Sequence, residues 1–166
     1  MNKITTIFLD IDGTLTDGKI NYNSEGIEVK AFHIKDGLII SAMVKLGYKF
    51  VVVTGRESSI VTRRMSELGV NEVFQKVSAK KEFILKYLEN AHISVNECCY
   101  IGDDLNDIAI MKHMGFRGCP ADGCIEVKMI SDFVSTYKGG EGAVRDILEF
   151  MLKQNGDWEQ IISQFE

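Results

Sequence analysis

The stretch Ile7-Phe8-Leu9-Asp10-Ile11-Asp12-Gly13-Thr14-Leu15-Thr16 lies near the start of the 166-residue chain. It is an apolar run that ends in an Asp-x-Asp-Gly motif, which predicts a buried parallel strand with two carboxylates at the sheet edge where α/β folds bind ligands. Asp10 and Asp12 would repel each other there, and Mg²⁺, which prefers oxygen ligands, relieves that repulsion. One carboxylate is then suited to nucleophilic attack and the other to proton transfer.

Two other interpretations of the motif are less consistent with the chain. A calcium loop that starts at Asp10 requires a glutamate at its twelfth position, which is Asn21 here, and an apolar strand precedes the motif where a helix is required. A solvated turn after a strand is the simpler alternative. The further polar residues at predicted strand ends, described below, argue against both.

Composition predicts one globular domain over residues 1–166. Apolar residues make up 45% of the chain, there is a single proline, and roughly 70% of the unfolded-chain surface can be buried at this length. The net charge of −5 opposes non-specific binding to nucleic acid or anionic membranes. No apolar run predicts a membrane span or a signal peptide, so we expect a cytoplasmic protein. The four cysteines are expected to be reduced thiols, because no Cys-x-x-Cys pair exists.

Apolar strand-like segments alternate with amphipathic helix-like segments, which predicts an α/β fold: a Rossmann-like parallel sheet with helices on both faces. A small β-hairpin insertion at about 18–32 is the exception, with its turn at Asn23-Ser24-Glu25-Gly26. We expect Asp36 to be the N-cap of the first helix. Expected strands are 4–9, 50–53, 73–74, 98–101, 116–118 and 133–134, and expected helices are 37–46, 58–68, 80–90, 104–114, 125–130, 142–154 and 158–165.

Further polar groups follow other predicted strands. Thr54-Gly55-Arg56 ends the strand at 50–53, where a hydroxyl and a glycine amide before a helix form a cradle for phosphate. Lys80 opens a later helix and would supply a fixed positive charge. Gly102-Asp103-Asp104-Leu105-Asn106-Asp107 follows the strand at 98–101 and adds carboxylates to the same edge. Each also has a plain alternative, Lys80 as a surface residue and Asp103 or Asp104 as a helix cap.

Taken in this order, these residues make the chain similar to the haloacid dehalogenase superfamily of phosphotransferases over nearly its whole length. The resemblance implies that Asp10 is the nucleophile and Asp12 the general acid/base. It implies a Mg²⁺ site formed by the Asp10 carboxylate, the Asp12 main-chain carbonyl and Asp103. The other residues that we assign to the site by this resemblance are Thr54, Gly55, Arg56, Lys80, Asn106 and Arg64 for phosphate or substrate, with Asp104 and Asp107 behind them.

The spacing leaves no room for a cap domain. About forty residues separate Asp12 from Thr54 and about twenty separate Lys80 from Asp103, and the hairpin and single helices use them. A site left open in this way would be wet and unselective. We therefore expect oligomerisation to cover it.

Within the capless subgroup, the chain resembles the 3-deoxy-D-manno-octulosonate 8-phosphate phosphatase family. The resemblance implies Mg²⁺-dependent removal of phosphate from a small phosphorylated sugar acid in lipopolysaccharide precursor synthesis. It also implies a homotetramer with sites at subunit boundaries, where Arg63 and Arg64 would either pair with the substrate carboxylate or form a solvated helix face. The matching stretches are Thr16-Asp17-Gly18, Lys30-Ala31-Phe32-His33-Ile34-Lys35-Asp36-Gly37, Thr54-Gly55-Arg56, Tyr100-Ile101-Gly102-Asp103-Asp104 and Gly139-Gly140-Glu141-Gly142-Ala143-Val144-Arg145.

Three alternatives remain on sequence grounds. At Glu141 the chain resembles 2-keto-3-deoxynononate 9-phosphate phosphatases, which are of the sialic-acid type. Arg56 instead favours an octulosonate substrate. A catalytically inactive oligomerisation or binding module would keep the same fold, although every expected catalytic group is present. A receiver-type signalling domain requires an aspartate after its third strand, and no acidic residue directly follows Phe74.

Overall fold

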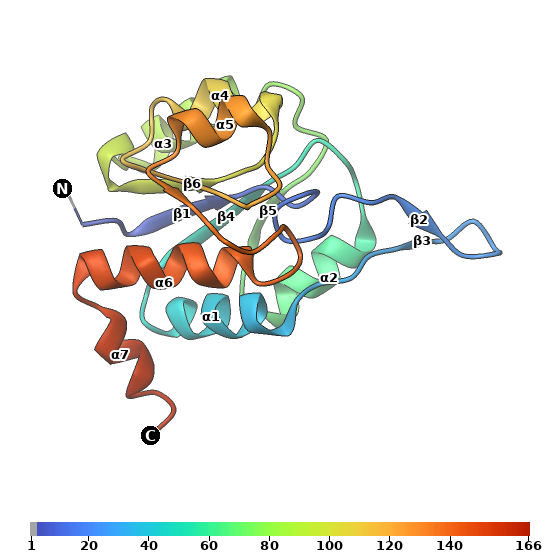
Figure 1. The fold of residues 1–166 in the computed structure, drawn as a ribbon. Coiled ribbons are helices and arrows are strands. Elements are labelled where there is room, and N and C mark those ends of the chain that lie inside the picture. Colours follow the sequence, from blue (N-terminus) through green and yellow to red (C-terminus); the bar gives the residue numbers. More distant parts are fainter. Residues whose placement is uncertain (1–2) are drawn as a thin grey trace.

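A six-stranded parallel sheet forms the centre of the protein, in a computed structural model that describes residues 3–166 (Figure 1). The strand order β5-β4-β1-β6-β7-β8 confirms the predicted Rossmann-like α/β sheet. The strands are β1 (Thr6–Leu9), β4 (Lys49–Val53), β5 (Glu72–Phe74), β6 (Cys98–Ile101), β7 (Phe116–Cys119) and β8 (Phe133–Val134).

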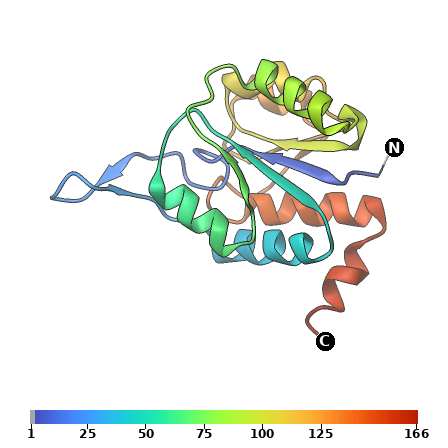
Figure 2. The same ribbon diagram turned by 180° about the vertical axis from the view of Figure 1, so that it is seen from behind.

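Helices cover both faces of the sheet (Figures 1 and 2). One face carries α1 (Ile34–Lys45), α2 (Ser59–Glu67), α6 (Ala143–Asn155) and α7 (Trp158–Ile162). The other face carries α3 (Lys80–Ala91), α4 (Leu105–Met111) and α5 (Ile125–Ile130), and a short 3₁₀ helix at Val95–Glu97 precedes β6.

Burial on both faces explains the continuous apolar sequence of the central strands. In β1, Ile7 and Leu9 pack into the core beneath α1 and α6, while Phe8 packs into the core beneath α3. In β4, Val52 joins the first core and Val51 joins the second. Two cores thus fix the sheet between its helix layers and hold the strand ends in place.

The position of β1 at the middle of the sheet brings the predicted site residues together. Leu9 lies in register with Val52 of β4 and with Ile101 of β6. The amide of Asp10 donates a 3.0 Å hydrogen bond to the Ile101 carbonyl, which extends the ladder by one residue. The segments that follow β1, β4 and β6 therefore emerge side by side at one edge.

The hairpin insertion projects from the body of the molecule (Figure 1). Its strands, β2 (Asn21–Tyr22) and β3 (Glu28–Val29), are shorter than the sequence predicts and pair antiparallel with each other. The Asn23 side chain accepts hydrogen bonds from the amides of Glu25 and Ile27, which fixes the turn. Two residues per strand make few ladder bonds, so the hairpin has little stability of its own.

The prediction that Asp36 caps the first helix is wrong. Helix α1 begins at Ile34 with His33 as its N-cap residue, which leaves Asp36 inside the first turn. The buried Asp36 carboxylate instead accepts a 2.7 Å hydrogen bond from the Arg145 amide in the first turn of α6. The Asp36 carboxylate thus pairs with an otherwise unpaired amide at the start of α6, and not with an amide at the start of its own helix α1.

Several helix ends also differ from the sequence-based bounds. Helix α4 ends at Met111 rather than at Met114, and α7 ends at Ile162 rather than at Phe165. All four cysteines are free thiols, as expected, and three of them are buried. Within residues 3–166, none of the helices has the length and apolarity needed to cross a membrane.

Candidate active site

A cavity of about 310 Å³ opens at the carboxyl ends of β1, β4 and β6. Asp10 enters it from β1, Thr54 from β4 and Asp103 from the loop after β6. Most of the residues that the sequence assigns to the site line this cavity. Its lining residues are Asp10, Asp12, Gly13, Gly18, Thr54, Gly55, Arg56, Asp103, Asp104 and Asn106.

Lys80 lies beneath the cavity and bridges two aspartates. Its ammonium nitrogen is 2.8 Å from Asp10 Oδ2 and 2.8 Å from Asp107 Oδ1, and its side chain is only 2% exposed. Burial alone would lower the pKa of Lys80, but the two carboxylates outweigh it and raise that pKa. Lys80 is therefore a fixed cation at the first turn of α3, which excludes the surface-residue alternative.

The carboxylates of Asp10 and Asp103 are largely buried and repel each other when both are ionised. Burial raises the pKa of Asp10 to about 6, and the neighbouring Asp107 adds to the effect. Burial likewise raises the pKa of Asp103 to about 7, although the Thr14 hydroxyl donates a 2.8 Å hydrogen bond to it. Carboxylate oxygens of Asp10, Asp103 and Asp107 lie within 4.8 Å of one another. A hard cation that prefers oxygen ligands relieves this repulsion, and Mg²⁺ fits it.

Asp107 orients its neighbours, because both of its carboxylate oxygens accept hydrogen bonds from them. Oδ1 accepts hydrogen bonds from Lys80 at 2.8 Å and from the Tyr100 hydroxyl at 2.6 Å. Oδ2 accepts them from the amides of Asp103 at 3.0 Å and Asp104 at 3.3 Å, where Asp104 is the N-cap of α4. Asp107 thus fixes both Lys80 and the loop that carries Asp103.

The turn after β1 brings its backbone against Asp103. The amides of Thr14, Leu15 and Thr16 all donate to the carbonyl of Ile11, which closes the turn tightly. Gly13 has φ +92°, and a Cβ atom there would overlap the Asp103 carboxylate. Glycine after the second aspartate is therefore required both by its backbone conformation and by the space that Asp103 occupies.

Thr54 is buried at the end of β4, whereas Gly55 is exposed at the rim of the cavity. The Thr54 amide donates to the Phe74 carbonyl at 3.0 Å, and the Val77 amide donates to the Thr54 carbonyl at 3.1 Å. These two bonds fix the loop between β4 and α2. The loop is thereby held where its hydroxyl and glycine backbone can face a phosphate.

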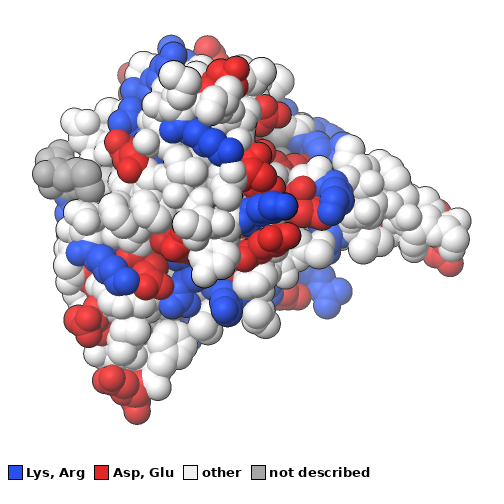
Figure 3. Space-filling view, viewed as in Figure 1, with Lys and Arg blue, Asp and Glu red and all other residues white. Residues whose placement is uncertain are grey.

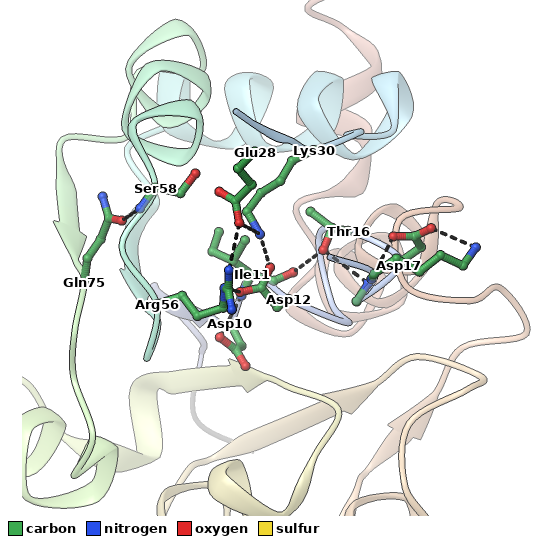
Figure 4. A network of polar contacts seen from close by, with 12 residues as sticks. Asp10, Ile11, Asp12, Thr16, Asp17, Glu28, Lys30, Arg56, Ser58 and Gln75 are labelled. Atoms are coloured by element: carbon green, nitrogen blue, oxygen red, sulfur yellow. Dashed lines mark hydrogen bonds and ion pairs between the residues drawn. The ribbon is translucent and has the colours of Figure 1, made fainter. Parts of the chain in front are cut away.

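Asp12, which lines the cavity, also belongs to a second charge network (Figure 4). Its carboxylate bonds to the Lys30 ammonium through Oδ1, and Arg56 Nε lies 3.9 Å from Oδ2. Glu28 accepts a 3.1 Å hydrogen bond from Arg56 and lies 3.4 Å from the Lys30 ammonium. Sequence reasoning assigned no role to Lys30 or Glu28. Lys30 opens one of the stretches that match the family, whereas Glu28 had no signal beyond its place in the hairpin that follows Asp12.

Arg64 does not reach this cavity within one chain. It pairs with Glu67 at 3.3 Å on its own helix and lines a separate cavity of about 480 Å³ with Arg63 and Phe32. Glu141 is also remote, because it is exposed and lines a third cavity of about 700 Å³ with His33 and Arg145. A contact of Arg64 with substrate across a subunit boundary stays a prediction.

Comparison with known proteins gives concordant matches. The family model described as haloacid dehalogenase-like hydrolase matches residues 21–119. The 3-deoxy-D-manno-octulosonate 8-phosphate phosphatase of Haemophilus influenzae is 32% identical over 156 residues, which cover 94% of this chain and 87% of that protein.

Solved structures show the same similarity. A 3-deoxy-D-manno-octulosonate 8-phosphate phosphatase from Moraxella catarrhalis, in complex with magnesium, phosphate and the sugar acid, superposes with a TM-score of 0.93 at 37% identity, covering 98% of this chain and 94% of that one. The cobalt-bound enzyme of Haemophilus influenzae gives a TM-score of 0.87 at 32% identity, covering 94% and 91%.

Proposed function

Because the chain belongs to the 3-deoxy-D-manno-octulosonate 8-phosphate phosphatase family of haloacid dehalogenase-like hydrolases, we propose that it removes the phosphate from that sugar acid phosphate in a Mg²⁺-dependent reaction. The observation that carries the proposal is the cluster of Asp10, Lys80 and Asp103 at the carboxyl edge of the sheet. A nucleophile, a fixed cation and a metal ligand are what phosphoryl transfer to an aspartate requires.

Asp10 has the position of the nucleophile. Its carboxylate oxygen attacks phosphorus in line, an Asp10 O–P bond forms, and the bond to the sugar oxygen breaks with its electron pair on that oxygen. Asp12 donates a proton to this oxygen and then takes one from the water that hydrolyses the aspartyl phosphate. Lys80 and the backbone around Thr54 stabilise the charge on the transferring group.

The carboxylates of Asp10 and Asp103, together with the Asp12 main-chain carbonyl, would hold Mg²⁺. The raised pKa values of Asp10 and Asp103 support this assignment, since burial and neighbouring carboxylates disfavour the ionised forms and Lys80 only partly offsets this at Asp10. When bound, Mg²⁺ supplies charge neutralisation at the phosphoryl oxygens. Asp107 and Lys80 keep these ligands in place through their own hydrogen bonds.

Substrate identity is tested by comparing kcat/KM for octulosonate 8-phosphate, nononate 9-phosphate and hexose phosphates in the presence of Mg²⁺. We expect a preference of at least about 100-fold for the first, which corresponds to about 2.7 kcal/mol of transition-state binding. Within one chain, Glu141, the residue shared with nononate phosphatases, lies outside the Asp10 cavity. A preference for nononate 9-phosphate would overturn the substrate assignment, and equal rates would leave a phosphatase of broad specificity.

The proposal extends to the organisation of the protein. Residues 1–166 form one phosphatase domain with the hairpin at about 18–32 inserted after β1. The protein acts in the cytoplasm, in lipopolysaccharide precursor synthesis, as a homotetramer with its sites at subunit boundaries. The hairpin exposes apolar side chains that support the proposed assembly: Ile20, Tyr22, Ile27 and Val29.

A further inference from the structure

Each of the two aspartates of the Asp-x-Asp motif has its own lysine. Lys80, in the first turn of α3, bonds to Asp10. Lys30, from the hairpin, bonds to Asp12 (Figure 4). The Lys30 side chain is 2% exposed, as buried as that of Lys80. A buried ammonium is stable only when it is paired, and its partners here are the carboxylates of Asp12 and Glu28.

The network around Lys30 alternates in charge and fixes one oxygen of Asp12. Glu28 lies between Lys30 and Arg56, so the two cations are held apart while both face Asp12. Lys30 bonds to Oδ1 of Asp12. The Arg56 nitrogen lies 3.9 Å from Oδ2, which is too far for a hydrogen bond. Oδ2 is therefore the oxygen that remains able to exchange a proton with a substrate.

We propose that Lys30 is a positioning residue that holds Asp12 in the orientation needed to protonate the leaving sugar oxygen. The proposal rests on the proposed function. Asp12 has a side chain that is 24% exposed at the rim of an open cavity, so without a fixed partner it would sample several rotamers. A general acid must lie within hydrogen-bond reach of the atom it protonates. Lys30 restricts Asp12 through Oδ1 and leaves Oδ2 for the transfer.

This role gives the hairpin a function inside its own subunit. Glu28 belongs to β3, and Lys30 follows β3 directly before the chain enters α1. The stem of the hairpin thus supplies both the lysine and the carboxylate that holds it. Covering a neighbouring site would depend on the projecting end of the hairpin, whereas positioning Asp12 depends on its stem.

The dependence of the rate on the leaving group tests the proposal. A sugar alkoxide must be protonated as it leaves, whereas p-nitrophenolate leaves without a proton. For Lys30→Met we expect kcat/KM to fall at least about 100-fold with the sugar acid phosphate and less than about tenfold with p-nitrophenyl phosphate. Because kcat/KM reports steps up to formation of the aspartyl phosphate, the later attack of water does not enter. Lys30→Arg should recover most of the loss.

The controls separate the alternatives. Lys19→Met removes an exposed lysine of the same insertion, which pairs with Asp17, and should change neither rate. If Lys30→Met does not fold, as judged by circular dichroism, Lys30→Gln should show a smaller loss with the same leaving-group dependence. Equal losses with both substrates, or no loss, would overturn the positioning role. A wild-type protein that hydrolyses neither substrate with Mg²⁺ would instead overturn the proposed function.

Discussion

Asp10 and Asp103 couple the stability of the protein to pH. Their pKa values are raised from 3.8 to about 6 and about 7, because both groups are buried among other carboxylates. Between pH 4 and these values, the folded chain binds more protons than the unfolded chain does. Without metal, the stability contributed by these groups is therefore present at low pH and is lost as pH rises from about 4 to about 7.

Mg²⁺ should restore that stability, and should do so more strongly at pH 8 than at pH 5.5. At a concentration about 100 times its Kd, the gain is about 2.7 kcal/mol, or roughly 5–10 °C in Tm for a chain of this size. At pH 5.5 protons compete for the same oxygens, so the shift shrinks. Calorimetry with and without Mg²⁺ measures it, and Asp103→Asn should abolish the shift at pH 8. An equal shift at both pH values would contradict this account.

Asp10→Asn should separate activity from stability. The amide cannot form the aspartyl phosphate, so hydrolysis of p-nitrophenyl phosphate with Mg²⁺ should fall below detection. The substitution also removes one of the crowded negative charges, so without metal the Tm at pH 8 should not decrease. Lost activity together with a lower Tm would mean that the ion pair of Asp10 with Lys80 stabilises the fold more than the repulsion costs.

Gly13 tests the tight approach of the β1 turn to Asp103. A methyl group in Gly13→Ala would displace the Asp103 carboxylate, and φ +92° is unfavourable for alanine. We expect the affinity for Mg²⁺ to weaken by at least about tenfold, which is the usual cost when the surroundings of a metal ligand are disturbed. Isothermal titration measures the affinity. The matched control is Gly26→Ala at the hairpin turn, where φ is also positive but no atom lies within 4 Å of the added methyl.

At the level of elements, the sequence predicts the site residues that directly follow the ends of strands. The motif after β1 and the residues that open the next segments are recognisable because apolar runs stop abruptly at polar side chains. Lys80 and Asp103 could therefore be assigned to one edge from the order of the residues alone. Lys30 could not, because its contact with Asp12 depends on how the hairpin folds back, and no periodicity encodes that path.

The helix-capping prediction for Asp36 failed for a similar reason, because the partner of Asp36 lies more than a hundred residues away in the sequence. Its buried carboxylate accepts from the Arg145 amide, and burial raises its pKa. Asp36→Ala leaves that amide unpaired, which should reduce the free energy of unfolding by about 1–3 kcal/mol. Asp36→Asn keeps an acceptor oxygen and should cost less. Urea denaturation measures both, and equal losses would show that the charge rather than the hydrogen bond stabilises the α1–α6 contact.

For the whole molecule, the projecting end of the hairpin is a feature that a single chain leaves unexplained. Ile20, Tyr22, Ile27 and Val29 are 48–62% exposed, and the arm that carries them shows little charge in Figure 3. A hairpin with two paired residues per strand is marginal in water. Exposed apolar surface on such an element is typical of an interface, and the proposed homotetramer would cover it.

The variant Ile20→Glu/Ile27→Glu should therefore dissociate the assembly, because each subunit would bring two carboxylates into an apolar contact. Sedimentation velocity should show a tetramer for the wild type and a smaller species for the variant. Met129→Glu, at an apolar residue of α5 that is 80% exposed, should leave the mass of the assembly unchanged.

Since Asp10, Lys80 and Asp103 come from one chain, the dissociated variant should still hydrolyse p-nitrophenyl phosphate. Its kcat/KM for the sugar acid phosphate should fall if neighbouring subunits cover the open site. A wild type that sediments as a monomer would contradict the assembly.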